Sequence, residues 1–344
     1  MNSNNSTYLA SLNKGLHSIM ESDPRVVILG EDILDPYGGA FKVTSGLSSR
    51  FPDRVFTTPV SEAGLVGVSV GLAMRGLRPV AEIMFGDFLM LAADQLINHA
   101  AKFRWVYNDK VRVPLVVRTP VGGRRSYGPT HSQCLEKHFL GVPGLWVVAP
   151  SIMHEPGNIL KKAVLDCDDP VLFIESKICY GKALAGALPG MVADTYSDAD
   201  SPFPTIHMRH DKEPSPSHGL VFCYGEMAPI CIEAVERLRE KEGLSIDMAV
   251  LSQVSPTPIT HIRAILDKCK PALCVYTEES VVTGGWSSEI SATVEEIHST
   301  QPNRPPIRHL RIGSKYTPVP ASRELESRTL PQAEDMIRAI LNCF

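Results

Sequence analysis

The sequence lacks the segments that would tie it to a membrane, to secretion or to nucleic acid. No run approaches the roughly 20 apolar residues that a membrane span needs. Residues 1–7 are polar, without the charged start and apolar centre of a signal peptide. No long basic run occurs, and 34 basic residues against 38 acidic ones give a formal charge of −4. We therefore expect no membrane association and no nucleic-acid partner.

Paired cysteines are also missing. The eight cysteines are scattered, none forms a Cys-x-x-Cys pair, and most lie in apolar runs such as residues 221–224. Cysteine in such runs packs as a small hydrophobic side chain. We expect a reduced, cytoplasmic protein that holds neither disulfides nor zinc.

The short motifs of common catalytic chemistries are absent as well. There is no Gly-x-x-x-x-Gly-Lys-Ser/Thr phosphate loop, no His-Glu-x-x-His and no Gly-x-Ser-x-Gly elbow, and no Gly-Gly pair opens a dinucleotide-binding fingerprint. His207 and His210 are close in sequence within a polar segment, and we favour a solvated pair over metal ligands. An active site would have to be built from dispersed loop residues.

What is present is an α/β pattern in two parts. With 344 residues, 44% of them hydrophobic, the chain is long enough for about two domains with buried cores. Strand-like apolar runs alternate with helical patterns, which predicts parallel sheets covered by helices. Residues 183–217 are rich in proline and polar side chains and lack periodicity. We predict a first domain over 1–185, a linker over 186–217 and a smaller α/β domain over 218–344.

One loop of the first domain runs directly into a helix predicted over 62–74. Ser61 suits its N-cap, and Glu62 falls in the first turn, where the helix dipole stabilises a carboxylate. Completion of this cap is the simpler interpretation of Glu62. Three glycines at spacings of three and four nevertheless form a bare face, although glycine costs about 1 kcal/mol relative to alanine inside a helix. This face predicts close approach of another helix or of a second subunit. The glycines are Gly64, Gly67 and Gly71.

Two further stretches carry candidate binding groups. The strand predicted over 79–84 leads into a helix predicted over 89–107, and ligands bind beyond the carboxyl ends of strands in open α/β sheets. Apolar side chains at this point either line a ring-binding shelf or pack in the core. They are Met84, Phe85 and Phe88. A glycine-rich loop follows the next strand, and polar loops at strand ends often carry active-site residues. This loop holds Arg124, Arg125, Tyr127 and His131.

Taken together, these stretches resemble the beta subunit of the thiamine-diphosphate-dependent 2-oxoacid dehydrogenases, the decarboxylating component of pyruvate and branched-chain complexes. The resemblance is carried in order by Gly30-Glu-Asp, Pro59-Val-Ser-Glu-Ala-Gly, Gly76-Leu-Arg-Pro, Asp94-Gln-Leu-Ile-Asn-His-Ala-Ala-Lys, His131-Ser-Gln-Cys and Pro143-Gly-Leu-Trp-Val-Val-Ala-Pro. Each motif is weak alone, but their joint order is specific. The resemblance implies a parallel-sheet, transketolase-like pyrimidine-binding domain followed by a transketolase-like C-terminal domain.

The resemblance also implies roles for single residues. It places Glu62 against the aminopyrimidine ring of thiamine diphosphate, where the carboxyl activates the cofactor. Phe88 matches the aromatic residue that stacks on this ring, and Met84 and Val60 line the same pocket. His131 matches a catalytic histidine near the substrate or the acyl acceptor.

Two other groups of residues follow from the same resemblance. The loop with Arg124, Arg125 and Tyr127 would face the substrate or the acceptor, because arginine holds anionic groups. A monovalent cation, K⁺, is implied at the family's cation loop. The matching residues are Leu115, Ala163, Val164 and Asp166.

The chain lacks the Gly-Asp-Gly…Asn motif that holds Mg²⁺ and the diphosphate in thiamine enzymes. In the family this motif lies on a separate alpha subunit. The resemblance therefore implies an alpha partner that carries the Mg²⁺ and diphosphate site, in an α2β2 assembly. It also implies a lipoyl acyltransferase as a partner.

Three functions stay open. In the first, the subunit pair decarboxylates a 2-oxo acid and transfers the acyl group to lipoamide. In the second, a stand-alone acyloin or transketolase-like carboligase transfers the acyl or ketol unit to a carbonyl acceptor, and Arg124 and Arg125 hold an anionic acceptor. In the third, the chain is a non-catalytic scaffolding subunit, although Glu62, Phe88 and His131 together argue against that.

Overall fold

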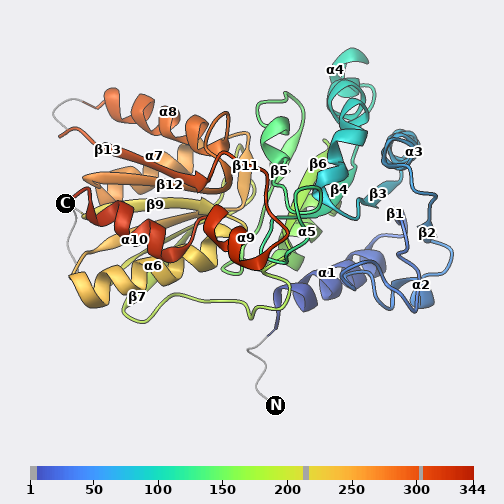
Figure 1. Cartoon of the computed structure of the whole chain (residues 1–344). Coiled ribbons are helices and arrows are strands. Elements are labelled where there is room, and N and C mark those ends of the chain that lie inside the picture. The colour runs from blue at the N-terminus through green and yellow to red at the C-terminus, as the bar shows by residue number, and fades with distance from the viewer. Residues whose placement is uncertain (1–5, 212–216, 302–304) are drawn as a thin grey trace. The chain divides into compact units, whose positions relative to one another are not determined.

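A computed structural model describes residues 6–211, 217–301 and 305–344. The chain forms two compact units. Each unit is an α/β layer structure with a mostly parallel sheet, which confirms the predicted fold class (Figure 1). Three ranges of the chain make up each unit. Unit 1 holds the chain up to Val121 with Gln133–Pro150 and Glu155–Leu184, and unit 2 holds Gly122–Ser132, Ser151–His154 and Ala185–Phe344.

The sheet of unit 1 is parallel throughout, in the order β5-β6-β4-β3-β1-β2. Its inner strands are short apolar runs with both faces buried, as expected of a parallel sheet between helices. The elements of unit 1 are α1 (Tyr8–Ser22), β1 (Val26–Gly30), α2 (Leu47–Arg50), β2 (Val55–Thr57), α3 (Glu62–Met74), β3 (Arg78–Glu82), η1 (Gly86–Ala92), η2 (Gln95–Ala100), α4 (Ala101–Val106), β4 (Val116–Val121), η3 (Glu136–Phe139), β5 (Trp146–Val148), α5 (Pro156–Leu165) and β6 (Val171–Ser176).

Local sequence explains where several of these helices begin and how they pack. Thr7 caps α1 by accepting a hydrogen bond from the Ala10 amide at 3.2 Å. Helices α1 and α5 approach each other backbone to backbone at Gly15 and Gly157. A Cβ on Gly157 would lie 2.1 Å from the Ser11 carbonyl oxygen, so only glycine fits there.

The prediction of a single helix over 89–107 is wrong. The chain instead forms a 3₁₀ turn in η1, a π-helical turn in η2 and then the short α4. Within this stretch Leu96 and Ala100 of η2 are buried, whereas Met90 and Leu91 of η1 are exposed. Apolar spacing alone does not distinguish such a change of helix type from a continuous α-helix.

A buried ion group joins three neighbouring strands of this sheet near their carboxyl ends. Arg118 on β4 donates hydrogen bonds to Glu82 on β3 and to Glu175 on β6, the latter at 2.7 and 2.6 Å. Tyr180 donates a further bond to Glu175 at 2.6 Å. Burial raises the pKa of Glu82, against the opposing effect of the Arg118 charge. Since a buried charge that loses its partner is strongly destabilising, the group fixes how these strands lie.

The sheet of unit 2 has the order β13-β12-β9-β10-β8-β7, and its last two strands run antiparallel to their neighbours. Helix α6 ends at Gly243, whose φ of 66° suits the left-handed conformation of a helix C-cap. The elements of unit 2 are β7 (Met191–Tyr196), β8 (Thr205–His210), β9 (Gly219–Tyr224), α6 (Met227–Glu242), β10 (Ile246–Leu251), β11 (Gln253–Ser255), α7 (Ile259–Cys269), β12 (Leu273–Val281), α8 (Trp286–Ser299), β13 (Arg308–Ser314), α9 (Arg323–Thr329) and α10 (Ala333–Leu341).

The segment 186–217, expected to be an irregular linker, contributes β7 and β8 to this sheet. The prediction that His207 and His210 are solvated is wrong, because both side chains are buried on β8. The flanking prolines and the buried polar residues of β8 hide the strand pattern. Within this segment, residues 212–216 lie outside the described residues.

The described residues bear on the expectations about membrane spans and disulfides. None of the helices in the described part of the chain has the length and apolar character needed to cross a bilayer. No disulfide joins the eight cysteines, all of which lie in described segments. Of the polar N-terminal residues 1–7, residues 1–5 fall outside the description.

The buried side chain of His154 should make the stability of the chain depend on pH. Its Nδ1 accepts a hydrogen bond from the Ser151 amide at 3.1 Å, and burial lowers its pKa from 6.5 to about 4. Between these values the unfolded chain binds a proton that the folded chain does not. The free energy of unfolding therefore falls as the pH drops from about 6.5 to about 4, by up to about 3 kcal/mol.

Urea denaturation between about pH 7 and pH 5 measures this effect. His154→Gln should flatten the decline, whereas a histidine at the surface, changed in His99→Gln, should leave it unaltered. An equally steep decline in His154→Gln and in the unchanged chain would contradict the assignment.

Candidate active site

The carboxyl ends of β1, β2 and β3 form one edge of the sheet of unit 1, since these strands are parallel neighbours (Figure 1). Each strand is followed by a candidate residue. Glu31 follows β1, Glu62 follows β2 after a short loop, and Met84 and Phe88 follow β3. This edge is where open α/β sheets bind their ligands.

Glu62 is the first residue of α3, and the predicted helix bounds are confirmed. The Ser61 hydroxyl caps the helix by accepting a hydrogen bond from the Gly64 amide at 3.3 Å. Only 5% of Glu62 is exposed, and among the described residues none donates a hydrogen bond to its carboxyl. The cap is therefore complete without Glu62, whose carboxyl accepts no hydrogen bond from the described residues.

Glu31 is a second buried carboxyl in the same place, and it was not singled out from the sequence. Burial raises its pKa, and so does the charge of the neighbouring Glu62, while a hydrogen bond from the Ser61 amide opposes the rise. Its Oε1 is buried without a hydrogen-bond partner. Burial and the neighbouring Glu62 carboxyl therefore favour the protonated form of Glu31. The Gly30-Glu-Asp motif was the available signal.

A chain of aromatic contacts fixes the position of Phe88. The Phe88 and Phe85 rings meet edge to face with centroids 6.1 Å apart, and Phe85 meets Phe41 in the same way at 5.6 Å. Phe41 in turn packs against Tyr180 at 5.2 Å, and Tyr180 bonds to Glu175 of the buried ion group. The half-buried Phe88 ring therefore stands on a continuous support that reaches the Arg118 ion group.

The remaining pocket residues differ in exposure. Met84 is half-buried beside the end of β3, whereas Val60 is 81% exposed before α3. The structure therefore brings Glu62, Met84 and Phe88 to one edge of unit 1, and the Val60 side chain is largely uncovered in this chain.

The other candidates lie in unit 2, on the loop Gly122–Ser132. Arg125 and Tyr127 are exposed, and His131 is half-buried with its Nδ1 3.1 Å from the Thr130 hydroxyl oxygen. Arg124 differs, because its Nε donates to Glu279 at 2.9 Å and its Nη2 to the Pro331 carbonyl at 2.6 Å. Arg124 thus holds the loop, and Arg125 and Tyr127 are the side chains that the loop presents.

Two glutamates that were not predicted as site residues anchor this loop. Buried Glu279 accepts a hydrogen bond from the Gly123 amide at 2.6 Å as well as from Arg124. Glu326 accepts from the amides of Arg124 and Ser126 at 2.8 and 3.0 Å. Arg124 has a φ of 67° and Ser126 a φ of 58°, so the loop needs these bonds to keep a conformation unfavourable for both residues.

The residues matched to a monovalent-cation loop lie together but already contain a cation. Leu115, Ala163 and Val164 are buried, and Asp166 is exposed. The Arg78 guanidinium donates to the Val164 carbonyl at 2.8 Å. A K⁺ ion would have to compete with Arg78 for this oxygen, so the residues present fit such an ion poorly.

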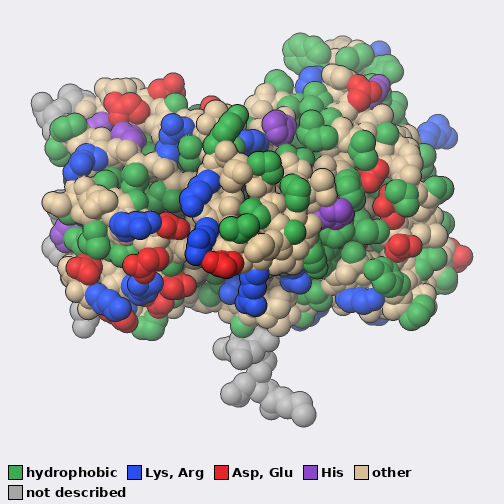
Figure 2. Space-filling view, viewed as in Figure 1, with side chains coloured by type: hydrophobic (Ala, Val, Ile, Leu, Met, Phe, Trp, Pro, Cys, Tyr) green, Lys and Arg blue, Asp and Glu red, His purple; other side chains and the backbone are tan. Residues whose placement is uncertain are grey.

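Unit 1 also has an exposed apolar surface on α4, apart from the candidate residues. Trp105 is 88% exposed there, and hydrophobic side chains gather over α4 in Figure 2. An open cavity of about 600 Å³ beside it is lined in part by Arg104, Pro143 and Asp169. None of the predicted site residues lines this cavity.

Comparisons with known proteins define the class first. Residues 5–182 match the family described as transketolase, pyrimidine binding domain, and residues 214–336 match transketolase, C-terminal domain. A solved structure, an inactive beta4 tetramer of a split-gene transketolase, has the same fold, with a TM-score of 0.67 at 20% identity over 98% of this chain and 97% of that chain. The chain is therefore a transketolase-like protein with both domains in the expected order.

Sequence relatives narrow the class. The beta-1 subunit of the pyruvate dehydrogenase E1 component from Arabidopsis thaliana is 33% identical over 96% of this chain and 86% of its own length. The 2-oxoisovalerate dehydrogenase subunit beta of Bacillus subtilis is 37% identical over 84% of each chain. The acetoin:2,6-dichlorophenolindophenol oxidoreductase subunit beta of Cupriavidus necator is 33% identical over 96% of this chain and 94% of its own length. The chain belongs to the E1 beta subunits of the thiamine-diphosphate-dependent 2-oxoacid dehydrogenase family.

The residues of unit 1 fit one end of that cofactor. Two neighbouring carboxyls, one of which has a buried oxygen without a hydrogen-bond partner, suit a protonatable ring nitrogen, and a supported aromatic ring suits stacking on a heterocycle. The diphosphate and its Mg²⁺ have no matching motif in the sequence. The fit is therefore to the aminopyrimidine end alone.

We predict that the anchored loop loses its support in Glu279→Gln. The change keeps the shape of the side chain but removes the charge that pairs with Arg124, which costs about 1.5–3 kcal/mol of unfolding free energy. Trypsin should also cleave the loop at Arg124 and Arg125 faster than in the unchanged chain. Urea denaturation and limited proteolysis measure the two effects.

Glu324→Gln provides the control, because Glu324 forms an exposed pair with Arg328 and should change stability by at most about 0.5 kcal/mol. Equal effects of the two changes would show that Glu279 does not hold the loop.

Proposed function

We propose that this chain is the catalytic beta subunit of a decarboxylating 2-oxoacid dehydrogenase and that Glu62 activates the aminopyrimidine ring of its cofactor. The supporting observation is the pair of neighbouring carboxyls, Glu31 after β1 and Glu62 at the start of α3, in which Glu31 Oε1 is buried without a hydrogen-bond partner among the described residues. A buried carboxyl oxygen without a hydrogen bond is costly. A ring nitrogen that shares its proton would remove this cost.

The chain's residues would divide the work around the ring. When bound, thiamine diphosphate supplies the nucleophilic carbon that attacks the carbonyl of a 2-oxo acid. Glu62 would hold a proton at the ring nitrogen, and Glu31, whose pKa is raised, would keep that proton available between the two carboxyls. Phe88 would stack on the ring in the position that Phe85 and Phe41 fix, and Met84 would cover its apolar edge.

We further propose that the loop of unit 2 handles the acyl group and its acceptor. Arg125 and Tyr127 are exposed and suit an anionic or polar group, while His131 has a ring nitrogen for proton transfer. The acceptor would be a lipoyl group carried by an acyltransferase. Arg124 serves this loop by positioning it.

An alpha subunit would supply the Mg²⁺ and diphosphate site and would cover α3. The exposed side of this helix consists of glycine, valine and methionine residues, and Val68 is 58% exposed. A Cβ on Gly71 would meet nothing within 4 Å, so packing within the chain does not require glycine there. A helix that is apolar on every side belongs in an interface. We propose an α2β2 assembly in which another subunit contacts this face.

A second substrate class is favoured by one relative. The Cupriavidus necator protein is named as an acetoin oxidoreductase subunit and matches nearly the whole chain. Acetoin is an acyloin, so an acyloin is the second candidate substrate. The complex purified from its native cells, with 2,6-dichlorophenolindophenol as electron acceptor, should oxidise either pyruvate and 2-oxoisovalerate or acetoin. Oxidation of acetoin but of neither 2-oxo acid would overturn the first candidate.

Glu62→Gln should lower the turnover of the assembled complex by about 10²- to 10⁴-fold, because an amide cannot hold a proton between itself and the ring nitrogen. The assay is steady-state oxidation of the accepted substrate. Glu296→Gln on the exposed side of α8 is the control and should leave turnover unchanged. Unchanged turnover in Glu62→Gln, with assembly intact, would leave the chain a non-catalytic scaffold.

Gly71→Ala should stabilise the isolated chain but weaken its assembly with the partner. Alanine raises helix stability by up to about 1 kcal/mol, and the isolated chain has room for the methyl group. In the complex the same methyl group would keep a close-packed partner away, so the affinity for that partner should fall.

Thermal unfolding of the isolated chain and the native mass of the complex provide the two readouts. Lys241→Ala on α6 is the control for the second, since Lys241 is exposed on a polar helix. A stabilised chain that assembles as well as before would show that no subunit packs on this face.

A further inference from the structure

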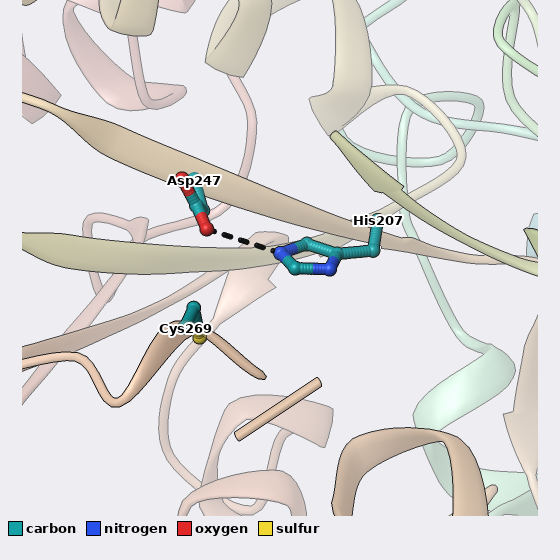
Figure 3. A group of neighbouring side chains, drawn as sticks. All are labelled: His207, Asp247 and Cys269. Atoms are coloured by element: carbon teal, nitrogen blue, oxygen red, sulfur yellow. Dashed lines mark hydrogen bonds and ion pairs between the residues drawn. The ribbon is translucent and has the colours of Figure 1, made fainter. Parts of the chain in front are cut away.

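Unit 2 contains a buried group of three chemically distinct side chains that no proposed step uses. His207 lies on β8, Asp247 on β10 and Cys269 at the end of α7 (Figure 3). One side chain offers an imidazole nitrogen, one a carboxylate oxygen and one a sulfur. Their ligand atoms all lie within 4.8 Å of one another.

The sheet register explains why the first two meet. Strands β8 and β10 are antiparallel neighbours, and His207 lies opposite Ala249. Asp247 is two residues from Ala249 and therefore projects from the same face of the sheet as His207, as its diagonal neighbour. Cys269 is the last buried residue of α7, a helix that packs against β8. The three residues are far apart in the sequence, so their spacing gives no sign of the group.

Burial makes this arrangement unusual for a purely structural set of polar residues. His207 is fully buried, and only 5% of Asp247 and 3% of Cys269 are exposed. His207 Nε2 and Asp247 Oδ2, the two atoms that would share the ion, lie 3.1 Å apart. A buried carboxylate is costly unless it is paired with positive charge or coordinates a metal. A cation among these three atoms would supply that charge.

We propose that His207, Asp247 and Cys269 bind a divalent metal ion of the zinc type. Thiolate, imidazole and carboxylate are the ligands that Zn²⁺ takes, whereas Mg²⁺ and Ca²⁺ prefer oxygen alone. In a tetrahedral zinc site the ligand atoms lie about 3.5 Å apart, which follows from metal–ligand distances of about 2.0–2.3 Å. The His207–Asp247 pair is already near that separation, so only a small inward movement of Cys269 is needed. A water molecule would fill the fourth position.

The ion would join two strands and a helix of unit 2. It would link β8 to β10 and α7 through three metal–ligand bonds. Binding would displace the proton of the Cys269 thiol, so the affinity for the metal should rise with pH. This site is separate from the Mg²⁺ and diphosphate site assigned to the alpha subunit, and the proposal for it does not depend on the proposed function.

Cobalt titration of the full chain tests the site, because Co²⁺ bound by a thiolate gives an intense near-ultraviolet charge-transfer absorption. Chain stripped with a chelator should develop this band with about one equivalent of Co²⁺, and Zn²⁺ should abolish it. Cys269→Ser should remove the band, and Asp247→Asn should weaken Co²⁺ binding by more than about tenfold. Cys274→Ser, which alters a buried cysteine of β12 outside the group, should leave the band in place.

The wild-type titration decides the question even where a variant does not fold. Absence of a charge-transfer band in the folded wild-type chain would overturn the proposal and leave His207 and Asp247 as a simple hydrogen-bonded pair. A band that persists in a folded Cys269→Ser chain would also overturn it, since the sulfur would then come from another cysteine.

Discussion

The Arg118 guanidinium, buried between Glu82 and Glu175, is the interaction on which the candidate active site depends. It joins the carboxyl ends of β3, β4 and β6, and a buried cation of this kind tolerates the loss of neither partner. Glu175 also accepts the Tyr180 hydroxyl, from which ring contacts pass through Phe41 and Phe85 to Phe88. The strand ends and the ring that would face the cofactor are thus held by one continuous set of contacts.

On this support the proposed site would form one half of a cofactor site. Glu31 and Glu62 are two carboxyls at one desolvated position, and Phe88 supplies an aromatic face, which together suit the aminopyrimidine ring. Nothing in the sequence suits the diphosphate and its Mg²⁺. The uncovered face of α3 has the same explanation, since a subunit that completed the site would also cover that helix. In this proposal, one division of the site between two chains explains both the missing diphosphate-binding motif and the uncovered face of α3.

The sequence predicted what depends on local or pairwise patterns. The bounds of α3 followed from the Ser61 cap, whereas the roles of Glu62 and Phe88, drawn from the order of short motifs, stay predictions. Predictions failed where distant residues decide the outcome. The helix expected over 89–107 is divided into a 3₁₀ turn, a π turn and a short α-helix, which apolar spacing does not reveal. Strand β8 forms by pairing with β7 and β10, although its polar residues mask the pattern. The roles of Glu31 and Glu279 follow only from their neighbours in the structure, Glu62 and Arg124.

The most direct test of the divided site is calorimetric titration of thiamine diphosphate with Mg²⁺ into the purified chain, alone and in complex with its alpha subunit, alongside native mass. The account predicts no tight binding to the folded chain alone and tight binding to the complex. Tight binding to the chain alone would show that it holds a complete cofactor site, which would contradict the central claim.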